Sequence, residues 1–212
     1  MKTDDLINAL GADAGRPALS LGGIWMIAAL SAVIIAGLVF MAALGPRPDI
    51  AAAAGTVRFP FKFVVTGLLA GTALVALLAL SRPETVSRTR LAALAAAPLA
   101  LAIAVGLELA AVPEAEWMTR LVGTNMMDCL AAIPSIGLGP LALFTLALRN
   151  AAPSRPLLAG AVAGLAAGGI AATFYASHCT DDSPLFVATW YTVAVAVLTI
   201  AGAVAGRTFA RW

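Results

Sequence analysis

The chain has 212 residues, of which 61% are hydrophobic and only 11% are charged, and its formal net charge is +2. This composition excludes an ordinary water-soluble domain and indicates an integral membrane protein. The alternating polar and apolar pattern of outer-membrane strands is missing from the sequence, so we expect membrane-spanning helices.

Residues 1–22 precede the first apolar run and form the expected cytoplasmic amino-terminal segment. Acidic residues at its start are not typical of a cleavable signal peptide, so the first span should be retained. Thr3 can cap a short helix with one apolar face, which is marginal alone in water and should order on a soluble protein partner. The predicted partner-binding residues are Asp4, Asp5, Leu6, Ile7 and Leu10.

Six apolar windows are long enough to cross a hydrocarbon core of about 30 Å, which takes roughly 20 helical residues. They predict an all-α membrane protein whose six-helix transmembrane domain covers residues 23–206, followed by a short tail at 207–212. The expected spans are residues 24–44, 63–81, 91–111, 129–148, 157–177 and 185–206.

Lys and Arg residues are distributed unequally between the two sets of loops. Nine of them fall on the side that holds both termini and loops 82–90 and 149–156, and only four fall on the other side. Because short loops rich in Lys and Arg stay in the cytoplasm, we expect both termini to be cytoplasmic. Two spans separate Cys129 from Cys179, so both thiols should reach the same exterior surface.

The segment between the fifth and sixth spans carries the only histidine, His178, next to one of the only two cysteines. Ser183 followed by Pro184 is a favoured helix start, so this connection should be a tight hairpin. Asn125 and Asp128 resemble a capping box at the start of the fourth span, close to Cys129.

The two thiols allow several interpretations. Each cysteine on its own can be a small buried hydrophobe. In an oxidising compartment the pair can form a disulfide, and with nearby ligands it can hold a soft metal ion. The tentative metal site is Cys129, Cys179 and His178, although neither a CxxC motif nor a second histidine supports it. The accessory candidates are His178, Asp181, Asp182 and Asp128; Asp128 and Asp182 also fit as helix caps.

Glu108 is the one carboxylate expected inside a span, so the sequence lacks the buried carboxylate chain of a proton- or cation-coupled transporter. Small residues recur at helical spacing, which favours tight packing within the bundle over a homo-oligomer formed through the same faces. These residues are Gly67, Gly71, Gly160, Gly164, Gly168, Gly202 and Gly206.

Several motifs together resemble the NrsF-like anti-sigma factors over the whole chain. They are Met1–Ile7, Asp128-Cys129-Leu130, the run from His178 to Phe186, and Trp190-Tyr191, together with the six spans. The resemblance implies an inner-membrane protein that sequesters an extracytoplasmic-function sigma factor through its amino-terminal segment. It also implies that Cys129 and Cys179 sense heavy-metal or oxidative stress from the periplasm.

The resulting hypothesis is a non-enzymatic anti-sigma factor with no constitutive cofactor, no direct contact with nucleic acid, and a transient heavy-metal ion as one form of signal. The main alternative is a quinone-linked membrane thiol oxidoreductase, which would explain paired exterior thiols. That chemistry usually needs a vicinal pair, whereas Cys129 and Cys179 lie far apart in sequence. A metal exporter is disfavoured by the apolar spans.

Overall fold

The structure is a computed structural model that describes residue 3, residues 20–83 and residues 88–209. The expected partner-binding residues Asp4, Asp5, Leu6, Ile7 and Leu10 lie outside these residues. The described part of the chain is helical and contains no strand. Its elements are α2 (Leu21–Ala43), α3 (Ile50–Ala54), α4 (Arg58–Leu80), α5 (Arg88–Ala92), the 3-10 turn η1 (Ala93–Ala95), α6 (Ala96–Ala111), α7 (Glu114–Val122), α8 (Met126–Arg149), α9 (Pro156–Ala176), α10 (Pro184–Phe186), the π-helical turn η2 (Val187–Tyr191) and α11 (Thr192–Phe209).

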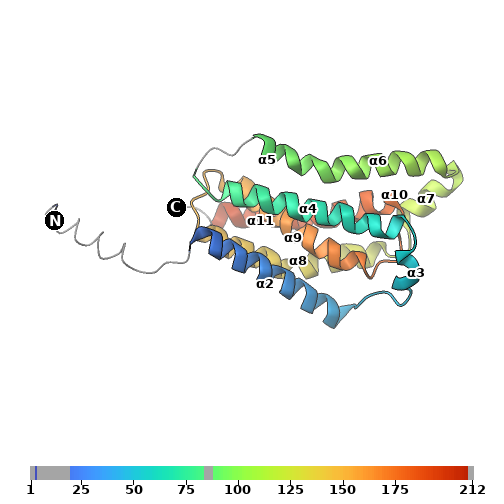
Figure 1. Cartoon of the computed structure of the whole chain (residues 1–212), viewed down its shortest axis with the longest axis horizontal. Helices are drawn as coiled ribbons and strands as arrows, with labels where there is room; N and C mark the ends of the chain where they lie inside the picture. Colours follow the sequence, from blue (N-terminus) through green and yellow to red (C-terminus); the bar gives the residue numbers. More distant parts are fainter. Residues whose placement is uncertain (1–2, 4–19, 84–87, 210–212) are drawn as a thin grey trace.

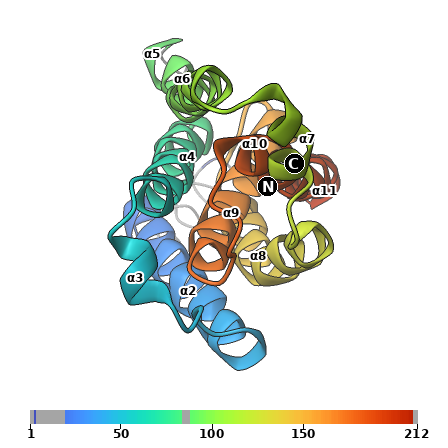
Figure 2. The same cartoon turned by 90° about the vertical axis from the view of Figure 1, so that its right-hand side faces the viewer.

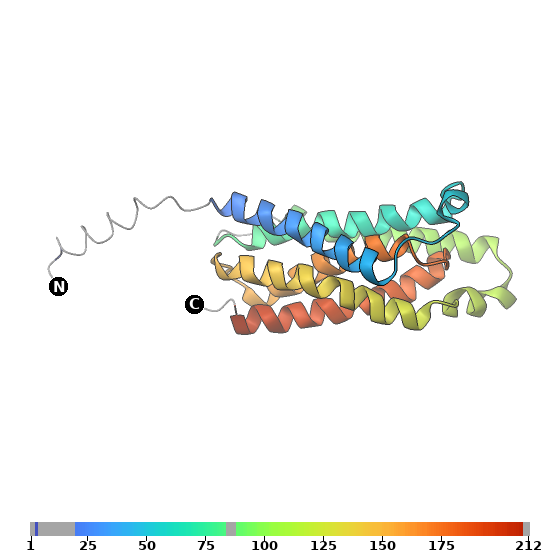
Figure 3. The same ribbon diagram turned by 90° about the horizontal axis from the view of Figure 1, so that it is seen from below.

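Six helical segments among the described residues are long and apolar enough to cross a membrane. The third, Arg88–Ala111, joins α5, η1 and α6, and the sixth, Pro184–Phe209, joins α10, η2 and α11. The long helices run side by side along the long axis of the molecule (Figures 1 and 3). Each segment overlaps one of the expected windows, which confirms an all-α, multi-pass membrane protein.

The two ends of the bundle differ in what they hold. The start of α2 and the end of α11 lie at one end, which we call the terminal end (Figure 3). The short helices α3 and α7 lie at the other, together with the connection between α9 and α10 (Figure 1). We call this second end the thiol end, and the connection, residues 177–183, the thiol loop.

Helix α9 occupies the centre of the bundle, where it packs against α4, α8 and α11 (Figure 2). Its glycines allow a close approach to α11. A Cβ placed on Gly160 or Gly164 would overlap the backbone of α11, and one on Gly202 would overlap α9 in return. Small residues on facing helices permit such contact, so the expected role in bundle packing is confirmed for this helix pair.

Gly67 and Gly71 on α4 behave differently from the α9 glycines. Both are exposed, and a Cβ built on either would meet no atom within 4 Å among the described residues. Packing within the described bundle therefore does not explain this pair. Homo-oligomerisation through a small-residue face stays a prediction, and α4 is the helix that leaves such a face open.

Helix α6 lies at the edge of the bundle, where it contacts α4 (Figure 2). The 3-10 turn Ala93–Ala95 precedes it, close to Pro98. Proline has no backbone N–H to donate to the Leu94 carbonyl, which favours a tighter turn over a regular α-helix at this point.

Helix α4 begins at Arg58 and not at the expected Phe63. The helix therefore includes two cations, Arg58 and Lys62, that hydropathy alone places in a loop. Both are ion-paired, to Glu108 and Asp182 respectively, and this pairing offsets the cost of holding charge in an apolar bundle. At the terminal end, α11 continues to Phe209, three residues beyond the expected end of the sixth span at residue 206.

Candidate functional site

The two thiols come from separate parts of the chain and meet at the thiol end. Cys129 lies in the first turn of α8, and Cys179 lies in the thiol loop. Both side chains are fully buried in the core of the bundle, and both thiols are free. The two cysteines thus lie at the same end of the bundle, but neither side chain reaches the surface.

Two tyrosines complete the buried cluster. The Tyr175 and Tyr191 rings lie 5.7 Å apart, and the Tyr191 hydroxyl lies beside the Cys179 thiol. That hydroxyl is buried and makes no hydrogen bond of standard geometry with the described residues. Tyr191 ends the π-helical turn η2, a local distortion that often marks functional sites in helices.

Burial raises the pKa of the Cys179 thiol, and the nearby Lys62 ammonium offsets only part of this effect. The thiol donates to the Asp181 carbonyl oxygen at 3.7 Å. Because the thiolate is the form that attacks oxidants and binds metals, the resting structure keeps this sulfur in its less reactive form.

Two buried cations hold the thiol loop. Lys62, which is 1% exposed, donates to the Cys179 carbonyl oxygen at 2.8 Å and pairs with Asp182 at 2.6 Å. Arg47 donates to the same carbonyl at 3.3 Å and pairs with Asp182 at 3.0 Å. Asp182 therefore bridges two cations, and it does not cap the sixth span as the sequence had suggested.

The sequence pattern placed Arg47 and Lys62 only among the charged residues of one set of loops, and their contacts with the thiol loop were not expected. A signal was available: Lys62 follows Arg58 by one helical turn at the edge of an apolar run, and the thiol loop offers two carboxylates. Such pairing is common because a charge at a membrane boundary needs a partner.

The loop between α2 and α3 adds further contacts to the thiol loop. The Arg47 amide donates to the Ser177 carbonyl oxygen at 3.0 Å, and His178 Nδ1 donates to the Gly45 carbonyl oxygen at 2.9 Å. Arg47 also pairs with Asp49 at 2.7 Å, a contact that raises the pKa of the guanidinium and lowers that of the carboxyl.

Asp181 links the thiol loop to α8. Its Oδ2 accepts from the backbone amides of Thr124 and Asn125, at 2.9 and 2.8 Å, and from the Asn125 side-chain amide. The expected capping box is therefore not formed, because Asn125 makes no side-chain cap and a carboxylate from another segment serves the helix start. Asp128 is exposed in the first turn of α8.

The arrangement of these side chains bears on metal binding. In the described part of the chain, no three His, Cys, Asp or Glu side chains come together in a group that could hold a metal ion. His178, Asp181 and Asp182 instead make the contacts given above.

A second ionic cluster surrounds Glu108 in α6, beside the thiol loop. This carboxylate is 5% exposed and pairs with Arg58 at 2.7 Å and with Arg120 at 3.0 Å. Ser183, at the end of the thiol loop, donates to it at 3.4 Å. The one carboxylate expected within a span is thus neutralised by two cations.

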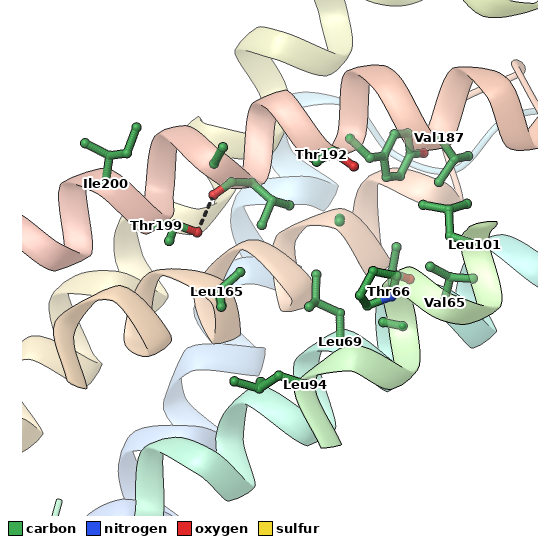
Figure 4. Close-up of a pocket in the computed structure, with 16 residues that line it drawn as sticks. Val65, Thr66, Leu69, Leu94, Leu101, Leu165, Val187, Thr192, Thr199 and Ile200 are labelled. Atoms are coloured by element: carbon green, nitrogen blue, oxygen red, sulfur yellow. Dashed lines mark hydrogen bonds between the residues drawn. The ribbon is translucent and has the colours of Figure 1, made fainter. Parts of the chain in front are cut away.

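Two cavities flank the site. A polar cleft of about 340 Å³ opens over the thiol loop, between Arg58, Arg120 and Asp181. An apolar cavity of about 420 Å³ lies deeper, between α4, α6, α9 and α11 (Figure 4). Its lining includes Val65, Leu69, Leu101, Leu165 and Ile200 (Figure 4).

Fold and site together define a class: a multi-pass helical membrane protein with a pair of buried free thiols at one end of the bundle. The chain belongs to the NrsF family, described as negative regulator of sigma F, whose match covers residues 10–212. The family is regulatory and not enzymatic, which favours the regulator over the thiol oxidoreductase.

Similarity to individual relatives extends over the full length. The chain is 38% identical over 218 aligned residues to the anti-sigma-F factor NrsF of Caulobacter vibrioides, with all of both chains covered. It is 31% identical over 221 aligned residues to a probable anti-sigma-F factor NrsF of Azospira oryzae, again over both whole chains. No solved structure matches the chain.

Proposed function

We propose that this chain is an anti-sigma factor of the bacterial inner membrane. It holds an extracytoplasmic-function sigma factor at its cytoplasmic face and releases it when Cys129 and Cys179 react with a heavy metal or an oxidant from the periplasm. The observation that carries the proposal is the pair of buried free thiols at the thiol end, one in α8 and one in the thiol loop. Asp181 holds this loop against the start of α8. Family membership supports the sigma-factor partner.

The geometry gives the reaction a mechanical consequence. Disulfide formation removes two protons and two electrons from the thiols to an oxidant and brings the sulfurs to about 2.05 Å. A soft metal ion would instead bind both thiolates and release two protons. Either product ties α8 to the thiol loop, and through that loop it acts on α9, the central helix of the bundle.

Release requires the stimulus to favour a second conformation. A tenfold loss of sigma affinity corresponds to about 1.4 kcal/mol of differential binding, which one new covalent or metal–thiolate link can supply. The cytoplasmic contact is assigned to the amino-terminal residues Asp4, Asp5, Leu6, Ile7 and Leu10, which present acidic and apolar side chains in one short segment.

Co-purification of the detergent-solubilised chain with the sigma factor encoded nearest to its gene tests the proposal. Wild type should retain the sigma factor and lose it on addition of cadmium or diamide. A Cys129→Ser, Cys179→Ser double variant should retain it under both treatments, because no thiol remains to react. A Leu6→Asp, Ile7→Asp variant should retain none at the outset.

Three results would count against parts of this assignment. Absence of any complex with wild type would contradict the sigma-binding role. Equal release from wild type and the double serine variant would contradict thiol sensing. Full retention by the Leu6→Asp, Ile7→Asp variant would move the binding surface away from the amino terminus.

A further inference from the structure

Lys62 shares its partners in the thiol loop with Arg47, but it contacts them from a membrane-spanning helix. Its ammonium contacts the Cys179 carbonyl oxygen and the Asp182 carboxylate, both in the thiol loop, and lies 5.3 Å from the centre of the Phe59 ring. The side chain is 1% exposed, so water does not replace these partners. An ammonium buried this deeply is stable only while its partners stay in place.

The contact to Cys179 joins the reactive residue to a spanning helix. The same residue carries the sulfur that reacts and the carbonyl oxygen that Lys62 holds. Lys62 belongs to α4, which continues to Leu80 near the terminal end and packs along α9 (Figure 1). Arg47 binds the same carbonyl but comes from the loop before α3, so it does not continue into a membrane-spanning helix.

We propose that Lys62 is a positioning residue that holds the thiol loop closed over the thiol pair and links the state of the thiols to helix α4. The inference rests on the proposed function for its consequence at the sigma factor. Contacts found in the reduced, free-thiol state stabilise that state relative to one in which they are broken. Loss of the Lys62 contacts therefore opens the loop and weakens sigma retention before any stimulus arrives.

Lys62→Met is the informative substitution, because it keeps an unbranched side chain only one atom shorter, removes the charge, and leaves Asp182 paired with Arg47. Arg58→Gln is the matched control. Arg58 lies one turn earlier on the same helix and is ion-paired as well, but its ion-pair partner is Glu108 on α6. In the Arg58→Gln variant, Glu108 keeps its contacts with Arg120 and with Ser183 of the thiol loop. Lys62→Arg keeps the positive charge and the hydrogen-bond donors, so it tests whether these are enough to hold the thiol loop.

Hydrogen–deuterium exchange of the purified chain in detergent measures how often the amides of the thiol loop open, with no partner present. We expect amides of residues 177–183 to exchange at least tenfold faster in Lys62→Met than in wild type, and at nearly wild-type rates in Lys62→Arg and Arg58→Gln. Sigma retention without stimulus should fall at least tenfold in Lys62→Met alone. Exchange in α2, remote from Lys62 in sequence, checks that the variant is folded.

Other results would contradict the role of Lys62 or its link to the sigma factor. Wild-type exchange in Lys62→Met overturns the holding role. Faster exchange with unchanged sigma retention overturns the link to the partner surface. If wild type itself binds no sigma factor, the proposed function fails, while loop exchange still decides whether Lys62 holds the loop. If Lys62→Met does not fold, Asp182→Asn removes the carboxylate that Lys62 shares with Arg47 and should also speed exchange of the loop amides, whereas wild-type exchange would overturn the holding role.

Discussion

At the residue scale, the thiol end is organised by buried charges and their partners. Lys62, Arg47 and Glu108 are each less than a tenth exposed, and each contacts at least one opposite charge. Breaking one partner of a buried pair usually costs more than the pair contributes, because the remaining charge stays desolvated. These buried pairs therefore hold the thiol end in place more strongly than exposed ion pairs could.

Glu108→Gln should lower the free energy of unfolding by about 1–3 kcal/mol, because Arg58 and Arg120 both lose their carboxylate partner. Glu116→Gln is the control, since Glu116 also pairs with Arg120 but is 53% exposed. Its effect should stay within about 0.5 kcal/mol. Detergent unfolding curves measure both, and equal effects would show that burial of Glu108 is not the deciding factor.

The pH dependence of Cys179 follows from its raised pKa. The buried neutral thiol stabilises the closed loop below the pKa of an unfolded cysteine, about 8.5. That stabilisation is lost as the pH rises through the higher folded pKa. In a Cys129→Ser background, the rate of alkylation by N-ethylmaleimide should reach its half-maximum above about pH 8.5, the value expected of a free cysteine. A half-maximal rate at about pH 8.5 would mean that burial does not perturb the thiol.

At the scale of elements, the contact between α9 and α11 holds the bundle together. Backbones approach closely where Gly160 and Gly164 face Gly202 and Gly206. In a membrane, lipid is as apolar as the side chains, so burying them against another helix brings no hydrophobic gain. Helix association therefore depends on close packing of this kind. The same residue type on α4, at Gly67 and Gly71, meets open space and contributes nothing to this contact.

Gly164→Val should destabilise the folded bundle by about 1–3 kcal/mol or more, because the new side chain overlaps the Leu198 carbonyl oxygen on α11. Gly67→Val makes the same chemical change on an exposed face and should leave stability nearly unchanged. Thermal midpoints of the two variants in one detergent compare them directly. A similar loss in both would indicate that Gly67 is also packed, for example against a second copy.

At the scale of the whole molecule, the charge distribution predicts the orientation. Positively charged residues gather around the termini, and an even number of spans places the start of α2 and the end of α11 at one end (Figure 3). The positive-inside rule then predicts that the terminal end faces the cytoplasm and the thiol end faces the periplasm. The proposed sensing of periplasmic stimuli depends on this orientation.

Reporter fusions test the orientation. Green fluorescent protein fused after Trp212 should fluoresce, because it folds in the cytoplasm, and alkaline phosphatase at the same position should be inactive. Alkaline phosphatase fused after Val112, between the third and fourth spans, should be active. The reverse pattern would place the thiols in the cytoplasm and would remove the proposed route for periplasmic signals.

The sequence alone determined the class of protein, the number of spanning helices and the shared end of the two thiols. The class and the number of helices follow from hydropathy and segment length, and the shared end of the thiols follows from the even number of spans between them. Each of these quantities is local or additive along the chain. It also pointed to close packing through the glycines of α9, since that pattern repeats within one helix.

Tertiary structure alone decided how the candidate site is built. Lys62 binds a carbonyl 117 residues away in the sequence, and Arg47 binds the same carbonyl across 132 residues. Asp181 caps a helix that begins in another hairpin, and Gly67 faces outward although its spacing matches that of the packed glycines. Local patterns determine which groups need a partner, but only the relative placement of helices determines which partner each group finds.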